Sequence, residues 1–240
     1  KVTNMGGMFN GASDFNQDIS YKPGAGNYGG DAWNTSMVTS MITVFSGTQF
    51  FNQDIGNWIV DNVNDMRGMF DGAIAFNQDI SGWNVGNVDD MSNMFAGAVA
   101  FDQNISIWDV STVRDFNSMF DGATSFNQPI GTWTLNTTFN IDMRNMFERA
   151  TAFDQDLSGW DVTFLNLAVN MFNNSGLSVS NYDKLLEGWA AQSVRSGVSF
   201  GAQGIFYCSA QAARDVLTTT FNWNITDGGP KCITLFDGPD

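Results

Sequence analysis

A repeat of 25 residues runs through most of this 240-residue chain and constrains its fold more than any other feature. The unit reads I-x-x-W-x-V-x-x-V-x-x-M-x-x-M-F-x-G-A-x-x-F-N-Q-D and is clearest from Ile80 to Asp102. Periods of about 20 to 50 residues are typical of solenoids, in which each unit is one coil that packs on its neighbours. The two aromatic columns are Trp33, Trp58, Trp83, Trp108, Trp133 and Trp160, and Phe9, Phe45, Phe70, Phe95, Phe120, Phe147 and Phe172.

Each unit divides into two predicted arms joined by the FNQD turn. The stretch around Trp83 and Val85 alternates apolar and polar residues, which predicts a short strand with both side chains inward. From Val88 the apolar residues fall at 88, 91, 94, 95 and 98, and this spacing predicts a helix of about two turns. Gly97 follows where a helix end needs a left-handed residue. We expect the Trp, Phe and Met columns to be continuous internal ladders, because one coil alone buries too little apolar surface.

The repeat stops before residue 178, and the rest of the chain has a different pattern. Ser180 and Asp183 have the spacing of a capping box, which predicts a first helix there, and Ser209 predicts a second one. Short β-forming runs at 198–200 and 223–226 flank the second helix. We therefore predict a solenoid of about seven coils over 1–177, with an insertion at 21–31, and a small α+β capping segment over 178–240.

The two cysteines lie in this C-terminal segment. A disulfide between Cys208 and Cys232 would close a loop of about 25 residues and stabilise the cap by roughly 3 kcal/mol in the chain-entropy model. Two buried free thiols are the alternative. A disulfide favours an oxidising location outside the cytoplasm. No apolar run is long enough to span a membrane, and Lys1 begins in mid-pattern without a signal peptide, which is typical of a fragment or a mature chain.

The repeat unit resembles the 25-residue leucine-rich-repeat variant of BspA-like bacterial surface proteins, which are common in Bacteroidetes and mycoplasmas. The resemblance covers residues 1 to about 176, and NYDKLLEGWA, FYCSAQAARDVL and WNITDGGPKC continue it to Cys232. It implies a right-handed leucine-rich-repeat solenoid with a parallel β-sheet on the concave face and short helices on the convex face. It also implies a secreted or surface-anchored protein used for adhesion or protein contact, with no catalytic residues. Local departures are Phe116 for a Met, Arg149 for the Gly, and two extra residues near Thr138.

Charge and composition argue against several classes of function. The 25 acidic residues against 10 basic ones give a net charge of −15, which disfavours nucleic acid as a partner. The absence of histidine excludes Ser-His-Asp and Cys-His catalysis and imidazole zinc ligands. Because the aspartates recur by repeat position, no pair of carboxylates is singled out for glycoside hydrolysis. We expect no enzyme, but an extracellular binding module for a protein or glycan partner, with a structural spacer as the alternative.

Three sets of residues are candidates for contact. The strand arm predicts an outward polar strip on a concave sheet, which repeat proteins often use for binding, with a merely solvated face as the alternative. The insertion adds a loop with Tyr21 and Tyr28, which is either a contact site or a tolerated surface loop. The strip consists of Asn34, Ile59, Asp61, Asn84, Ile107, Asp109, Thr134 and Asp161.

The third set is the column of aspartates in the FNQD turns. Like charges about 4.8 Å apart in stacked coils repel, and a row of calcium ions would relieve the repulsion because calcium prefers oxygen ligands. Asn104 and Pro129 interrupt the column, so capping of backbone N–H groups in the turn is the main interpretation and no cofactor is expected. The column consists of Asp18, Asp54, Asp79 and Asp156.

Overall fold

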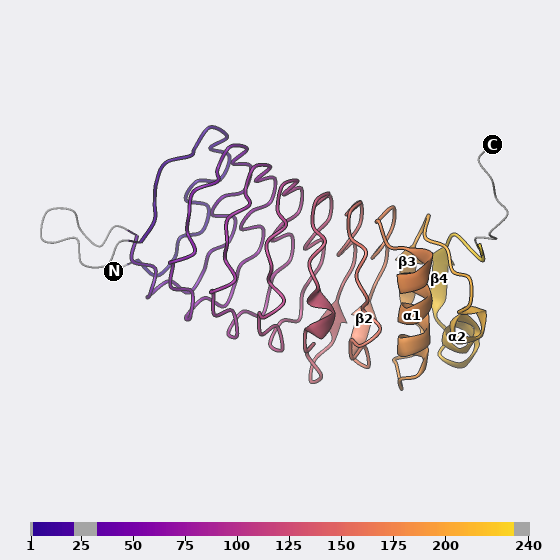
Figure 1. The fold of residues 1–240 in the computed structure, drawn as a ribbon. Coiled ribbons are helices and arrows are strands. Elements are labelled where there is room, and N and C mark those ends of the chain that lie inside the picture. Colours follow the sequence, from indigo (N-terminus) through magenta and orange to yellow (C-terminus); the bar gives the residue numbers. More distant parts are fainter. Residues whose placement is uncertain (1, 22–32, 233–240) are drawn as a thin grey trace, which may run out of the picture.

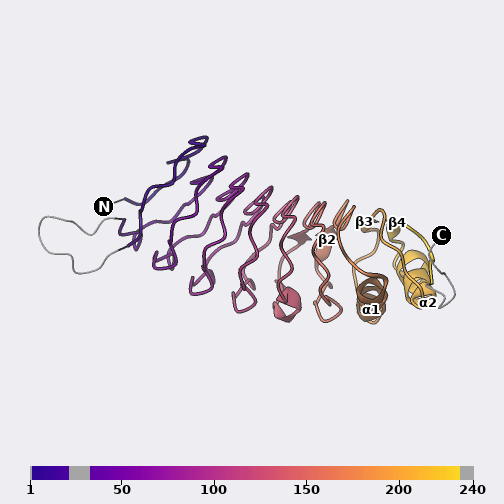
Figure 2. The same ribbon diagram turned by 45° about the horizontal axis from the view of Figure 1, so that its top comes forward.

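The computed structural model describes residues 2–21 and 33–232, which form an elongated stack of coils (Figure 1). Tyr28 and most of the predicted insertion lie outside the described residues, whereas Tyr21 is partly buried against the core. Regular elements are short and concentrate toward the C-terminal end of the stack (Figure 2). They are η1 (Ile130–Thr132), β1 (Ile141–Asp142), β2 (Leu165–Leu167), α1 (Val179–Ala190), β3 (Ser199–Ala202), α2 (Gln211–Asp215), η2 (Val216–Thr220) and β4 (Asn224–Asp227).

Backbone hydrogen bonds join each coil to the next along one part of the repeat, the ladder segment, which comprises residues 90–97 in the clearest unit. The N–H groups of Met91, Asn93, Phe95 and Gly97 donate to carbonyl oxygens 24 residues further on, at N···O distances of 2.9, 2.8, 2.9 and 2.7 Å. The N–H groups of residues 94, 96 and 98 donate instead to the carbonyl three residues earlier, at 3.1 Å each. The ladder segment is therefore a ribbon of consecutive turns whose alternate N–H groups point to the neighbouring coil.

This ribbon occupies the place of the predicted helix, so the predicted helical arm is wrong. An α-helix needs every N–H to bond four residues back, whereas here alternate N–H groups leave the coil. Asn93 and Gly97 also have φ angles of 57° and 63°, outside the right-handed helical region. The five apolar residues that suggested a helical face are nevertheless all 0% exposed. Their three- and four-residue spacing marks the inward side of the ribbon.

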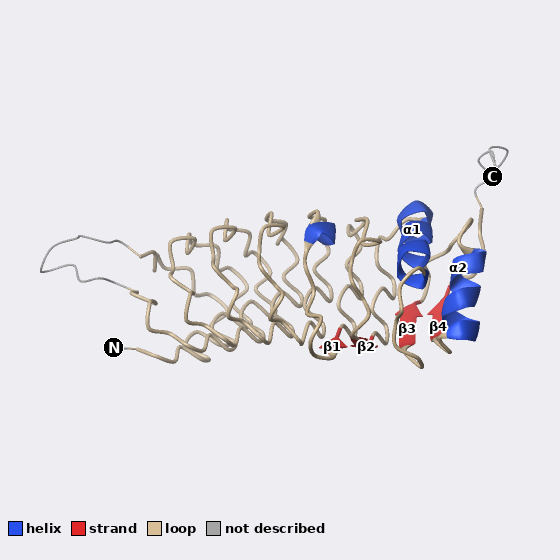
Figure 3. Cartoon of the chain, turned by 90° about the horizontal axis from the view of Figure 1, so that it is seen from below, coloured by secondary structure: helices blue, strands red, loops and turns tan. Residues whose placement is uncertain are grey.

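Parallel pairing also lies on the ladder segment and not on the predicted strand arm. Around Trp83 the backbone turns instead, since its N–H donates to the Ile80 carbonyl at 3.1 Å and the N–H of Val88 donates to Val85 at 2.9 Å. Figure 3 shows β1 to β4 along one edge of the stack, with η1 and α1 along the opposite edge. The bridges run Asn4–Ser40–Asp65–Asp90–Asp115–Asp142, then through the parallel pairs β1–β2, Ala168–Phe200 and β3–β4.

The aromatic columns are internal and continuous, as predicted. Adjacent rings from Phe45 to Phe172 stack with centroids 5.3 to 5.7 Å apart. The indole N–H of Trp83 donates to the Ile55 carbonyl of the preceding coil at 3.2 Å, and Trp58, Trp108, Trp133 and Trp160 make the equivalent bond. Each indole thus satisfies its buried polar atom while joining two coils.

Both predicted C-terminal helices are present, but the predicted capping box is wrong. Helix α1 begins at Val179, and its N-cap is Ser178, which accepts the N–H of Asn181 at 3.3 Å. The carboxylate of Asp183 lies in this helix and accepts the N–H groups of residues 208, 209 and 210 at 2.9, 3.0 and 3.1 Å. Burial opposes its charge, but these donors outweigh burial and lower the pKa of Asp183. The residue thereby ties α1 to the segment that leads into α2.

The C-terminal segment continues the stack beyond the predicted boundary at 177. The N–H of Phe172 donates to the Gly201 carbonyl in β3 at 2.8 Å, which extends the ladder into this segment. Trp189 in α1 donates to Leu157 at 3.1 Å and so extends the tryptophan column. Cys208 and Cys232 form the predicted disulfide, with their Cα atoms 4.7 Å apart. The segment both lengthens the stack and covers its last coils.

Candidate binding face

The outward side chains of the ladder segments form one face, which we call the ladder face. They alternate with buried residues such as Met66 and Met91, so residues two apart share the face. The first column consists of the bridge positions Asn4, Ser40, Asp65, Asp90, Asp115, Asp142, Leu167, Ser199 and Asn224. The second column, two residues on, includes two buried members, Ser92 and Gly201. It consists of Gly6, Ile42, Arg67, Ser92, Asn117, Arg144, Val169, Gly201 and Thr226.

Four successive members of the first column are aspartates, and their own backbone holds each in place. Asp65, Asp90, Asp115 and Asp142 each accept the N–H two residues further on, at 3.1, 2.9, 2.8 and 3.0 Å. Asn4 makes the same bond to Gly6 at 2.7 Å. The carboxylates are therefore fixed in a row on coils joined by parallel bridges.

Arginines neutralise this row only in part. Arg67 lies 2.9 Å from Asp65 and 3.4 Å from Asp90, and Arg144 lies 2.6 Å from Asp142. Partial burial, together with the neighbouring carboxylates, raises the pKa of Asp115, although the N–H of residue 117 opposes this effect. The pKa of Asp71, in the ladder segment of another coil, is also raised by burial and by Asp121. The middle of the ladder face therefore carries closely spaced negative charge.

A shallow hollow lies within this acidic part of the face. It has a volume of about 310 Å³ and is lined by Asp89, Asp90, Arg114 and Asp115. Arg114 pairs with Asp89, and both side chains are nearly half exposed, at 46% and 45%. Exposed pairs of this kind contribute little to stability. Their charges are thus available for contact with a partner.

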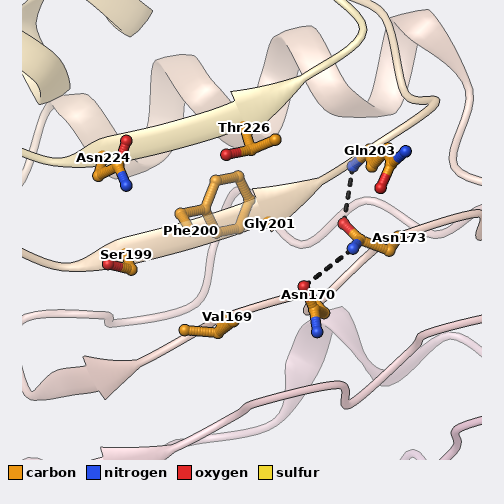
Figure 4. A pocket seen from close by; sticks show the side chains of 9 residues that line it. All are labelled: Val169, Asn170, Asn173, Ser199, Phe200, Gly201, Gln203, Asn224 and Thr226. Carbon is orange, nitrogen blue, oxygen red and sulfur yellow. Dashed lines mark hydrogen bonds between the residues drawn. The ribbon is translucent and has the colours of Figure 1, made fainter.

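Toward the C-terminal end the ladder face loses its charge. Leu167, Ser199 and Asn224 continue the first column, and a second hollow of about 250 Å³ lies beside them (Figure 4). Uncharged polar side chains dominate its lining. The lining residues are Val169, Asn170, Asn173, Ser199, Phe200, Gly201, Gln203, Asn224 and Thr226.

The strip predicted beside the tryptophans is on the surface but belongs to no strand. Asn34, Asn84, Asp109 and Asp161 each accept the N–H two residues on, at 3.0, 3.3, 3.1 and 3.0 Å. Ile107 is 75% exposed. Asp61 and Thr134 are also exposed, and Ile59 is partly buried. The structure thus places these residues along the outside of a turn, where backbone bonds between coils do not align them.

The FNQD aspartates cap their own turns. Asp18, Asp54, Asp79 and Asp156 accept the N–H two residues further on at 3.0, 2.9, 2.9 and 3.0 Å. The hydroxyl and N–H of Ser81 lower the pKa of Asp79. Within 2–21 and 33–232, no three or more Asp, Glu, His or Cys side chains are grouped so that they could hold a metal ion. Calcium binding stays a prediction, and isothermal titration with calcium, together with melting in a chelator, tests it.

The asparagine two positions earlier has a role that the sequence argument missed. Asn77 Oδ1 accepts the N–H of Asp102 at 3.0 Å and the Nε2 of Gln103 at 2.8 Å, both from the next coil. Asn52 and Asp102 accept the corresponding pair of bonds from the coils that follow them. The FNQ turns are thus joined by a second column of hydrogen bonds between coils.

One comparison with known proteins identifies a family. A family model described as "Mycoplasma protein of unknown function, DUF285" matches residues 1–24, 24–133 and 80–189. The chain belongs to this family. The DUF285 match passes the predicted domain boundary and ends at Trp189, the residue that extends the tryptophan column into α1. No curated protein and no solved structure matches the chain.

Sequence reasoning missed the ladder face because it assigned that segment to a helix. The sequence nevertheless contains a signal that indicates turns in this segment. Aspartate recurs at 65, 90, 115 and 142, always just before a buried Met or Phe. A short polar side chain that bonds the N–H two residues on is typical of a turn.

No described helix is long and apolar enough to cross a membrane.

Proposed function

We propose that this DUF285 protein is a non-catalytic binding module that works outside the cell and contacts a basic protein partner through the acidic part of its ladder face. We further propose that its coils are a BspA-like leucine-rich-repeat solenoid. The row Asp65, Asp90, Asp115 and Asp142 is the observation that carries the binding proposal. The disulfide supports an oxidising location.

Two physical properties favour this face as a contact surface. Its carboxylates are already oriented by backbone bonds, so little side-chain freedom is lost when a partner binds. A net charge of −15 attracts basic partners and accelerates their encounter. The strip beside the tryptophans was the predicted contact surface because the alternating pattern there predicts the sheet. Since parallel pairing lies on the ladder segment, the same argument now favours the ladder face.

Charge reversal separates the two faces. The double variant Asp90→Lys with Asp115→Lys changes the ladder face, and Asp61→Lys with Asp109→Lys makes the same total charge change beside the tryptophans. A ten-residue arginine-rich peptide serves as the probe, with an acidic peptide of equal length as the control. We expect the ladder variant to lose at least about tenfold in affinity and the other variant to lose much less. Equal loss in both variants would show only a general effect of charge, and the proposal would fail.

A structural spacer is the second candidate function. Continuous ladders of hydrogen bonds and stacked rings from the second coil to α1 favour a stiff rod that holds another domain at a distance. A spacer needs no specific face. Unchanged probe binding in both double variants would therefore support the spacer and count against the binding module.

A further inference from the structure

The uncharged hollow at the C-terminal end of the ladder face presents polar groups without partners. Within the described part of the chain, the side chains of Ser199, Gln203, Asn224 and Thr226 make no hydrogen bond and are exposed. All four line the same hollow, with β3 and β4 supplying three of them (Figure 4). Exposed polar groups are solvated, so a ligand that displaces the solvent has to offer equivalent hydrogen bonds.

The floor of the hollow is held rigidly. The Nδ2 of Asn173 donates to Asn170 at 3.0 Å, and the Oδ1 of Asn173 accepts the N–H of Gln203 at 2.8 Å. Strands β3 and β4 pair over four residues, which aligns Ser199 with Asn224 and Gly201 with Thr226. Asn170 and Asn173 are thus hydrogen-bonded within the protein. The exposed amides and hydroxyls of the hollow can bond a ligand.

Gly201 in the second column lines the hollow at a close contact between two coils. A Cβ at this position would lie 2.3 Å from the backbone nitrogen of Asn170, so no other residue fits without movement of the coil. On either side Val169 and Thr226 carry side chains. Glycine at position 201 therefore lets the two backbones approach closely, and this contact fixes the coils that line the hollow.

The chemistry of the lining selects the class of ligand. No charged side chain lines the hollow, so neither an anion nor a cation would be paired there. An apolar ligand would leave the amides without partners, and Phe200 is only 1% exposed. Amides and hydroxyls both donate and accept, which matches a molecule rich in neutral hydroxyls. A volume of 250 Å³ is below the range of about 300–1,000 Å³ for drug-sized ligands and suits a single ring.

We propose that this hollow binds one uncharged sugar residue of a glycan. Gln203 and Asn224 bond its hydroxyls, and Val169 packs against its ring. This site goes beyond the proposed function, because it lies outside the acidic row and needs no charged partner. It is therefore independent of the arginine-peptide experiment.

Nuclear magnetic resonance titration of the whole chain tests the site with named probes. The neutral probes are the methyl glycosides of glucose, galactose, mannose and N-acetylglucosamine, each raised to about 20 mM, and the charged probes are glucuronic acid and glucosamine. We expect at least one neutral glycoside to shift the side-chain amide signals of Gln203 and Asn224. The charged sugars should bind more weakly.

Three variants and a control complete the experiment. Val169→Arg should abolish binding by filling the mouth, and the fold accepts arginine there because Arg67 and Arg144 occupy the same ladder position in other coils. Gln203→Ala and Asn224→Ala should each weaken binding at least about fivefold through a lost hydrogen bond. Asn57→Ala, at an exposed site on another arm, should change nothing. The site is refuted if no neutral glycoside binds, if charged sugars bind more tightly, or if the variants bind as the control does.

Discussion

Replacing Asn77 by alanine tests the hydrogen-bond column that joins the FNQ turns. The alanine removes an acceptor for the N–H of Asp102 at 3.0 Å and for the Nε2 of Gln103 at 2.8 Å. Each such bond contributes about 0.5 to 1.5 kcal/mol net. Gln103 keeps a second acceptor, the Asn77 carbonyl at 3.1 Å, so the loss falls in the lower part of the combined range. We expect the free energy of unfolding to fall by about 1 to 2 kcal/mol.

The same chain offers a matched control for this variant. Asp102 fills the equivalent place one coil later and accepts the N–H of Asn127 at 2.9 Å and the Nε2 of Gln128 at 2.7 Å. Asn77→Asp therefore keeps an Oδ1 atom that can accept both bonds. Its unfolding free energy should stay within about 0.5 kcal/mol of the parent protein.

Urea unfolding followed by tryptophan fluorescence measures both variants of Asn77. In a chain of this size, 1 kcal/mol corresponds to a shift of about 2 to 4 °C in melting temperature, so a thermal scan gives an independent value. The reasoning is refuted if Asn77→Ala unfolds within about 0.5 kcal/mol of the parent. It is equally refuted if Asn77→Asp loses as much as Asn77→Ala, because the acceptor would then not be the cause.

Three further predictions concern the backbone, the disulfide and pH. Gly97 has a φ of 63°, so Gly97→Ala should cost about 1 kcal/mol or more in urea unfolding, whereas Gly82→Ala, with open space around it, should not. Reduction of Cys208–Cys232, which are 24 residues apart, should lower unfolding free energy by about 3 kcal/mol, and an unchanged urea midpoint would contradict this. Burial and neighbouring carboxylates raise the pKa of Asp115, so its charge destabilises the folded state above that pKa. Asp115→Asn should therefore be the more stable protein at pH 7, and its advantage should disappear as pH falls below the ordinary value of 3.8.

The sequence was sufficient to predict which side chains are buried, because burial in a stack repeats with the coil. The Trp and Phe columns follow directly from spacing, whereas the disulfide was predicted from the two cysteines with free thiols as the alternative. The backbone path could not be predicted from the sequence, since apolar residues at 88, 91, 94, 95 and 98 suit a helix and a ribbon of turns equally well. What distinguishes them is that alternate N–H groups bond 24 residues away. That choice depends on the neighbouring coil, and its local signatures are only Gly97 and the turn-forming aspartate before a buried Met or Phe.

The capping error at α1 has a similar cause. Ser180 and Asp183 have suitable spacing for a capping box, but Ser178, two residues earlier, is the N-cap. Asp183 instead binds three N–H groups near Cys208, and this contact spans 25 to 27 residues of sequence. A local pattern cannot show that a carboxylate has a better partner elsewhere in the fold. The parallel sheet was predicted on the wrong segment for the same reason, because strand pairing depends on which segment bonds to the next coil.

The fold itself does not require the acidic row on which the binding proposal rests. Asn4 makes the same backbone bond as the aspartates, to Gly6 at 2.7 Å, and carries no charge. Ser40 occupies the next place in the column with no carboxylate at all. The four successive aspartates further along the column are charged, and burial, with a smaller contribution from the carboxylates of Asp90 and Asp142, raises the pKa of Asp115. A charge that costs stability, at positions where a neutral residue preserves the backbone bond, is explained if it serves contact with a basic surface.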